Sequence, residues 1–171
     1  MQSSTAWFSG VPRDVRLWWL ESEEGAMANG PDECVFCKVL RWQLPSTVVF
    51  EDARTMAFLD IAPATDGHTV VIPKRHTADL LSVSTADLAA VIRTTQTVAR
   101  ILDGRLNPDG LSIFQSNRAA GWQDVFHLHF HVVPRWTDDP LRRPWRTTPG
   151  SAQRTAEVAA RLGLSPGPRG S

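Results

Sequence analysis

Three of the five histidines in this 171-residue chain lie within the stretch HLHFHVVPR, which starts at His127. His127, His129 and His131 are spaced by two, and apolar residues separate them. In a β-strand successive side chains point to opposite faces, so the three imidazoles would share one face, roughly 6–7 Å apart. That spacing suits a cluster of imidazoles around one phosphate group or one metal ion.

Three roles are open for this cluster. The histidines can be hydrogen-bonded structural residues, they can bind one metal ion together as in zinc hydrolases, or the central His129 can act as a nucleophile while its neighbours handle protons and phosphate. A nucleophilic imidazole must be neutral, and the ordinary histidine pKa of about 6.5 provides that form at pH 7. We then expect its other ring nitrogen to donate to an acceptor such as a backbone carbonyl, which fixes the tautomer.

The chain's two cysteines, Cys34 and Cys37, form a CxxC pair. Two cysteines are too few for a disulfide-stabilised secreted scaffold, so the pair fits a metal site or a redox pair in a reducing compartment. A redox pair of the thioredoxin kind requires a βαβ context, which this sequence lacks. A CxxC pair supplies only two of the four ligands of a structural zinc site.

Charge and hydropathy argue against several partner classes. Lys+Arg and Asp+Glu both number 18 and no long basic run occurs, so we expect neither a nucleic-acid nor a membrane partner. No apolar run reaches the roughly 20 residues of a membrane span. The N-terminus lacks the apolar segment of a signal peptide, and we therefore expect a cytoplasmic protein.

Short strands joined by short links, with one long helix between them, predict an α+β fold with a five-stranded antiparallel sheet. The expected strands cover residues 46–52, 55–61, 68–73, 110–117 and 126–134. Helices are expected near 37–42, over 84–104 and over about 151–162. The long helix begins with a capping box, Ser84 with Asp87, and is expected to end at Gly104.

Composition divides the chain into three parts. Residues 1–32 are an N-terminal extension that is poorly ordered or forms an arm, and residues 33–140 are the central domain. Residues 141–171 are a C-terminal extension with the last helix and a disordered tail.

Two long stretches resemble the histidine triad (HIT) family. The family pattern His-x-His-x-His, with apolar residues between the histidines, is present as HLHFHVV, and the accompanying GHTVVIPKRH is also typical of the family. The chain resembles the N-terminal half of bacterial members in CVFCKVLRWQLPSTVVFEDARTMAFLDIAPATDGHTVVIPKRH, and the C-terminal half in GLSIFQSNRAAGWQDVFHLHFHVVPR. The likeness covers about residues 33–136 and implies the HIT fold.

The resemblance implies a nucleotidyl hydrolase or transferase. In this family the middle histidine attacks the α-phosphate of a nucleotide, and water or another acceptor resolves the nucleotidyl-histidine intermediate. His129 takes that position here, His131 would donate to the α-phosphate, and His68 would close the other side of the site. Gln123 lies where the family places a glutamine near the phosphate.

The resemblance also implies a nucleoside-binding set. Asp60 corresponds to the acid that holds the ribose hydroxyls, and Ile61 and Phe58 would line the base pocket. Asn117 lies in the loop that carries the family's phosphate-side amide, one residue closer to the triad than in some relatives, so Ser116 is an alternative for that role.

Asp124 departs from the family pattern, because many relatives have a serine or threonine there. A carboxylate beside a phosphate is repulsive unless it is protonated or paired. Asp124 therefore points away, pairs with Arg118, or favours a cationic amine as the leaving group. Trp122 is also bulky for this loop, and would cover the site or its dimer edge.

Some bacterial relatives bind structural zinc through a CxxC pair, the histidine that ends the IPKxH stretch and the first histidine of the triad. The residues at those positions are Cys34, Cys37, His76 and His127. The resemblance thus implies structural zinc, with no catalytic metal required, a purine nucleotide substrate and a homodimer. The substrate is a nucleoside phosphoramidate or a dinucleoside polyphosphate, and the product a nucleoside monophosphate, AMP by family expectation. Two alternatives are a phosphorylase, which uses phosphate as acceptor, and a non-catalytic nucleotide-binding or interaction module.

Overall fold

The structure is a computed structural model that describes residues 30–142, 145 and 147–164. The expected N-terminal extension, except for residues 30–32, and the expected disordered tail lie outside the described residues. The described residues belong to two units, which divide between Asp139 and Pro140 and are each described by themselves.

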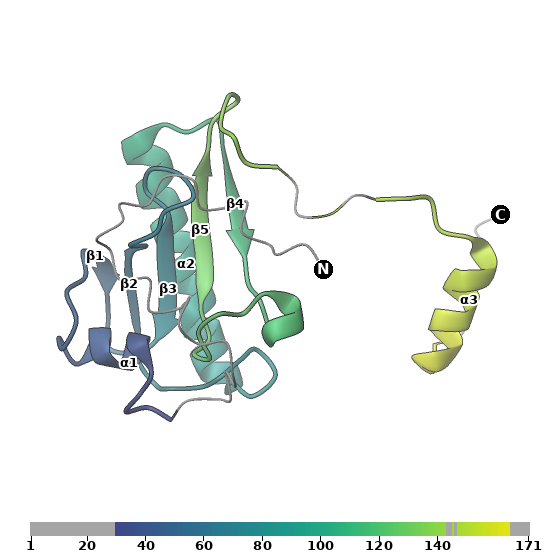
Figure 1. Cartoon of the computed structure of the whole chain (residues 1–171), viewed down its shortest axis with the longest axis horizontal. Helices are drawn as coiled ribbons and strands as arrows, with labels where there is room; N and C mark the ends of the chain where they lie inside the picture. The colour runs from purple at the N-terminus through teal and green to yellow at the C-terminus, as the bar shows by residue number, and fades with distance from the viewer. Residues whose placement is uncertain (1–29, 143–144, 146, 165–171) are drawn as a thin grey trace, which may run out of the picture. The chain divides into compact units, whose positions relative to one another are not determined.

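Five strands form one antiparallel sheet in the order β1-β2-β3-β5-β4 (Figure 1). They are β1 Val48–Glu51, β2 Thr55–Leu59, β3 Thr69–Pro73, β4 Gly110–Phe114 and β5 Phe130–Arg135. The first three strands follow one another along the sheet, and a tight turn joins β1 to β2 because the Asp52 carboxylate accepts the backbone N–H groups of Arg54 and Thr55. The prediction of an α+β fold with five antiparallel strands is confirmed.

Two helices cover opposite faces of the sheet (Figure 1). The long helix α2, Thr85–Leu106, buries Val91, Val98 and Leu102 against one face. The short helix α1, Val35–Leu40, packs Val39 against Met56, Phe58, Val70 and Ile72 of the other face. His131 lies opposite Val70 in the β3–β5 register, and paired residues share a face, so His131 lies on the α1 side.

The fifth strand begins later than expected. β5 starts at Phe130, not at residue 126, so His127 and His129 precede the strand. The backbone N–H of Leu128 donates to the carbonyl of Thr77, and that of His127 donates to Val125. These loop bonds replace the ladder with β3, but the alternation of faces continues. Leu128 packs with Phe130 and Val132 on the α2 side, and Phe36 of α1 contacts His127 and His129 on the other side.

Both ends of α2 have identifiable caps. The Ser84 hydroxyl accepts the N–H of Asp87 at 3.1 Å, as the capping box predicted. The prediction that Gly104 ends the helix is wrong, because the helix continues to Leu106. It ends where Asn107 adopts the left-handed conformation, φ 48° and ψ 52°, which asparagine tolerates at a helix C-terminus.

The remaining helices are short. Helix α1 starts two residues before the expected position. The last helix, α3, spans Ala152–Arg161 and has no buried residue. A 3-10 turn, η2, covers Ala119–Gly121. None of the described helices combines the length and the apolar character needed to cross a bilayer.

We expect Leu102→Ala to lower the free energy of unfolding by about 2–5 kcal/mol, because it opens a cavity between α2 and the sheet. Leu102 is 5% exposed, whereas Ile92 on the same helix is 47% exposed. Ile92→Ala should therefore change stability by no more than about 0.5 kcal/mol. Urea denaturation of both variants measures the difference, and equal losses would contradict this assignment of the core.

Candidate active site and metal cluster

His129 is buried, and its two ring nitrogens are distinguished by a single hydrogen bond. Its Nδ1–H donates to the backbone carbonyl of His127 at 2.7 Å. A neutral imidazole carries one proton, so Nε2 keeps its lone pair. Burial lowers the pKa of His129, which favours this neutral form at pH 7. The side chain is therefore held as the tautomer that a nitrogen nucleophile requires.

A second chain of hydrogen bonds determines the tautomer of His131. The backbone N–H of Ala64 donates to Nδ1 of His68 at 3.1 Å, so the proton of His68 lies on Nε2. His68 Nε2–H then donates to Nδ1 of His131 at 2.8 Å. His131 consequently carries its proton on Nε2, and this N–H is available to a ligand. The ring centroids of His131 and His129 are 4.9 Å apart, and the two rings are nearly perpendicular.

Asp60 lies beside these two histidines. One carboxylate oxygen, Oδ1, accepts the N–H of Ala62 at 2.9 Å, and Oδ2 lies 3.6 Å from Nε2 of His68. Ile61, next in sequence, is 68% exposed and open to a ligand. Phe58 is 5% exposed and belongs to the core. Of the two residues expected in the base pocket, only Ile61 lies at the surface.

Gln123 is buried, and the protein backbone satisfies its side-chain amide. The Oε1 atom accepts the N–H of Arg118 at 2.7 Å, and Nε2 donates to the carbonyls of Ala78 and Val125. These bonds hold the loop that precedes the triad against the segment after His76. In this geometry Gln123 positions the loop.

Two other residues expected near the phosphate also bond within the protein. The Asn117 amide accepts the N–H of Leu80 at 2.8 Å and donates to Gln115 Oε1 at 2.7 Å. The Ser116 carbonyl accepts from Gln115 Nε2 at 2.8 Å. Asn117 therefore joins the end of β4 to the 77–82 loop.

Asp124 is exposed, and within the described residues no ion pair joins it to Arg118. Partial removal from water raises the pKa of its carboxyl group, and nearby His129 opposes that shift. Of the three alternatives for Asp124, the structure therefore does not show the pairing with Arg118.

The cysteines and two histidines form a second cluster beside the first. One ligand atom from each of Cys34, Cys37, His76 and His127 lies within 4.8 Å of the others. Nδ1 of His127 lies 3.5 Å from Cys34 Sγ and 3.6 Å from Cys37 Sγ, and Cys37 Sγ lies 3.3 Å from His76 Nδ1. Zinc–sulfur and zinc–nitrogen bonds of normal length place tetrahedral S and N ligands about 3.5 Å apart, so these four residues fit zinc.

The ring of His127 is oriented toward this cluster. Its Nε2–H donates to the backbone carbonyl of Pro73 at 2.8 Å, which leaves the lone pair on Nδ1 directed at the two sulfur atoms. Without a metal ion, burial raises the pKa of the Cys37 thiol to about 12. A bound cation would favour the thiolate form that metal ligation needs.

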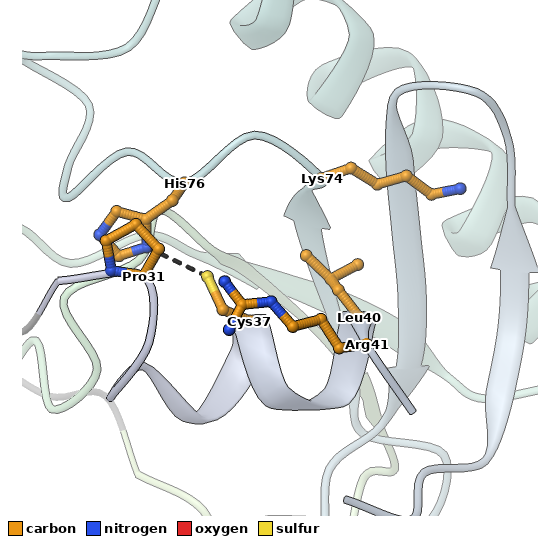
Figure 2. Close-up of a pocket in the computed structure, with 6 residues that line it drawn as sticks. All are labelled: Pro31, Cys37, Leu40, Arg41, Lys74 and His76. Carbon is orange, nitrogen blue, oxygen red and sulfur yellow. Dashed lines mark hydrogen bonds between the residues drawn. The ribbon is translucent and has the colours of Figure 1, made fainter. Parts of the chain in front are cut away.

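A surface pocket of about 290 Å³ opens beside this cluster (Figure 2). Cys37 and His76 lie on its wall, joined by the contact drawn in Figure 2, and Arg41 lies close to Cys37. Lys74 points away from the cysteine and pairs with Glu51 at 2.6 Å. The pocket lining includes neither His129 nor His131, so this pocket is separate from the candidate catalytic residues.

Sequence reasoning missed Phe36. This residue lies between the two cysteines, and its ring centroid is 5.3 Å from that of His129 and 6.0 Å from that of His127, in edge-to-face contacts. It also packs on Phe58. The sequence signal was the position of Phe36 between Cys34 and Cys37, because a residue between two ligands must lie close to the site that they form.

The five-stranded antiparallel sheet with its flanking helices matches solved structures of HIT family proteins. The HIT domain family model matches residues 41–138, and this chain belongs to that family. An uncharacterized HIT-like protein of Borreliella burgdorferi is 41% identical over 110 residues, 63% of this chain and 78% of the relative. The adenosine 5′-monophosphoramidase of Schizosaccharomyces pombe is 34% identical over 102 residues, 60% of this chain and 74% of the relative.

Solved structures support the same assignment. The crystal structure of a Zn-bound histidine triad family protein from Mycobacterium smegmatis is 36% identical and superposes with a TM-score of 0.63, covering 78% of this chain and 96% of that one. The fold prediction and the family resemblance are thereby confirmed.

We expect stability to fall in acid, partly through His131. Burial lowers its folded-state pKa from 6.5 to about 3. Below pH 6.5 His131 becomes protonated in the unfolded chain but stays neutral in the folded protein. The free energy of unfolding therefore falls as the pH is lowered from 6.5 to about 3. His131→Asn should reduce this slope in denaturation curves measured across that range at a fixed zinc concentration. An unchanged slope would contradict the neutral state of His131 in the folded protein.

Proposed function

We propose that this protein is a nucleotidyl hydrolase or transferase. It cleaves nucleoside phosphoramidates or dinucleoside polyphosphates at the α-phosphate, through a nucleotidyl-histidine intermediate, and releases a nucleoside monophosphate. One observation carries the proposal: the 2.7 Å bond from Nδ1–H of His129 to the His127 carbonyl, which leaves Nε2 unprotonated. Family membership supports the reaction class, and the S. pombe relative is named as an adenosine 5′-monophosphoramidase. AMP is therefore the expected product.

The chemistry divides into two displacements. In the first, the Nε2 lone pair of His129 forms a bond to the α-phosphorus while the bond to the leaving group breaks. The 2.7 Å bond to the His127 carbonyl stabilises the positive charge that the ring acquires. In the second, water attacks the same phosphorus and gives up a proton to the solvent, while the P–N bond breaks and its electron pair returns to Nε2, so that His129 is neutral again.

His131 and His68 assist through their fixed protons. His131 donates Nε2–H to a phosphoryl oxygen, where negative charge develops in each displacement. His68 holds His131 in this tautomer through the 2.8 Å bond. Asp60 is assigned to the ribose hydroxyls, with Ile61 beside the base. Gln123 acts by positioning the loop before the triad.

Zinc is proposed for the cluster of Cys34, Cys37, His76 and His127. The ligand spacing fits a tetrahedral ion, and the M. smegmatis relative is described as Zn-bound. Zinc bound there would join α1 to the segment that carries His129, a structural role. The assigned catalytic steps use this chain's histidines.

A homodimer is also proposed, because β4 forms an edge of the sheet and Ile113 on that strand is 46% exposed. Pairing of two such edges would satisfy the backbone N–H and C=O groups of β4 that no strand pairs within the described residues.

The direct test mixes the protein with adenosine 5′-phosphoramidate and with diadenosine tetraphosphate, with and without added phosphate. Wild type should release AMP and show an acid-labile adenylyl adduct by intact mass. His129→Ala should lose both, because it lacks the attacking nitrogen, and added imidazole should restore part of the AMP release if the variant is folded. ADP formed only with phosphate would identify a phosphorylase instead. No turnover and no adduct from folded, zinc-loaded protein would contradict the proposal and leave a binding role.

Metal content tests the zinc assignment. Wild type and His68→Ala should each hold one zinc per chain, because His68 belongs to the neighbouring cluster. Cys34→Ser and His76→Ala should lose zinc and melt at lower temperature. Zinc present at about 100 times its Kd stabilises by about 2.7 kcal/mol, and the variants lose that contribution. One equivalent retained in both ligand variants would overturn the assignment.

A further inference from the structure

The loop between β4 and the triad holds two large residues in backbone conformations that favour glycine. Arg118 has φ 64° and ψ 163°, a region that is essentially restricted to glycine. Trp122 has φ 69° and ψ 31°, in the left-handed region. At both positions the backbone is strained, and a glycine would adopt the same conformation without that strain.

Buried Gln123 fixes these conformations. Its side-chain oxygen accepts the Arg118 N–H at 2.7 Å, and its own N–H donates to the Arg118 carbonyl at 3.1 Å. The N–H of Trp122 donates to Ala119 at 2.9 Å. The loop is thus attached to the residue that lies four positions before His127.

Packing within the described residues does not offset the strain. Trp122 is 64% exposed, and Arg118 is also exposed. Within the part of the chain that the structure describes, neither side chain makes a hydrogen bond, an ion pair or an aromatic contact. The hydrogen bond from the Ser82 hydroxyl is the main cause that lowers the pKa of Asp79, and the charge of Arg118 adds a smaller effect. The Asp79 carboxylate itself accepts from Ser82 and from the N–H of Leu81. Backbone bonds hold both conformations, but the two side chains remain exposed, and residues held in such strained conformations cluster at ligand-binding sites.

We propose that Arg118 and Trp122 form the subsite for the leaving group, and that its ligand is the distal nucleotide of a dinucleoside polyphosphate. This inference rests on the proposed function and selects one of its two substrate classes. An exposed indole offers a stacking surface for a second base, and a guanidinium offers paired donors to phosphate oxygens.

The position of the loop suits a substrate that extends past His129. Asp60 lies at the His131 end of the triad, with Oδ2 3.9 Å from His131 Nδ1. The loop lies at the His127 end, where Gln123 bonds to Ala78 and Val125. A dinucleoside polyphosphate bound across His129 would place one nucleoside at Asp60 and the other at Trp122. When Nε2 bonds to the α-phosphorus, the bond to the bridging oxygen breaks, and that oxygen keeps the electron pair on the departing nucleotide.

Glycine substitutions test the subsite, because they remove the side chain and also relieve the strain. Arg118→Gly and Trp122→Gly should each lower the ratio of kcat/KM for diadenosine tetraphosphate to that for adenosine 5′-phosphoramidate by about tenfold. Neither variant should melt at a lower temperature than wild type. Trp122→Phe keeps a stacking ring and should retain most of the ratio.

The chain supplies a matched control in Trp42. This residue also has a left-handed backbone, φ 59°, and is 64% exposed, but it follows α1. Trp42→Gly should leave the substrate ratio unchanged.

Three results would overturn the inference. The first is an unchanged substrate ratio in both loop variants. The second is a lower substrate ratio in Trp42→Gly as well. The third is a loss of kcat/KM that is confined to a lysine-linked adenosine phosphoramidate, which would identify a subsite for a cationic amine. Calorimetry with diadenosine tetraphosphate on His129→Ala and His129→Ala/Trp122→Gly separates this inference from the proposed function. It reports weaker binding by the double variant even where no turnover occurs, and equal affinities would overturn the subsite.

Discussion

The hydrogen bond between Nδ1–H of His129 and the carbonyl of His127 determines which nitrogen of His129 can react, and it depends on a second bond. The carbonyl that accepts from His129 belongs to a residue whose own ring is held by the carbonyl of Pro73, at the end of β3. The strand therefore orients His127, and His127 orients His129. Burial favours the uncharged form of both rings, so each keeps one lone pair in a defined direction.

His127 serves both clusters through different atoms. Its ring nitrogen faces the two sulfur atoms, while its backbone carbonyl accepts from the proposed nucleophile. Phe36 reinforces this link, because it extends from α1 between the cysteines and packs edge-on against both His127 and His129. A change at the metal cluster would therefore act on the nucleophile through one residue and one aromatic side chain.

Several features of the fold were predictable from local pattern. Short apolar stretches joined by short links marked the strands, and Ser84 with Asp87 marked the start of α2, because a capping box acts within one turn. The end of α2 was not predictable from Gly104, since the helix continues until Asn107 takes the left-handed conformation. The predicted start of β5 was also wrong. The N–H of Leu128 donates to the carbonyl of Thr77, which lies 51 positions away in the sequence, and is therefore not part of the sheet ladder. The occupation of the Gln123 amide by Arg118, Ala78 and Val125 likewise depends on loop packing that no spacing rule contains.

The sequence by itself determined which residues could take part: five histidines and a carboxylate for the candidate active site and metal cluster, the CxxC pair, and the family pattern that relates them. Only the tertiary structure decided which nitrogen of each imidazole carries the proton. The physical reason is that a neutral imidazole has two nearly equivalent tautomers, and the groups that choose between them often come from distant positions. Pro73 is 54 positions from His127, and His68 is 63 positions from His131. The fold brings these partners within hydrogen-bonding distance and thereby assigns one tautomer to each ring.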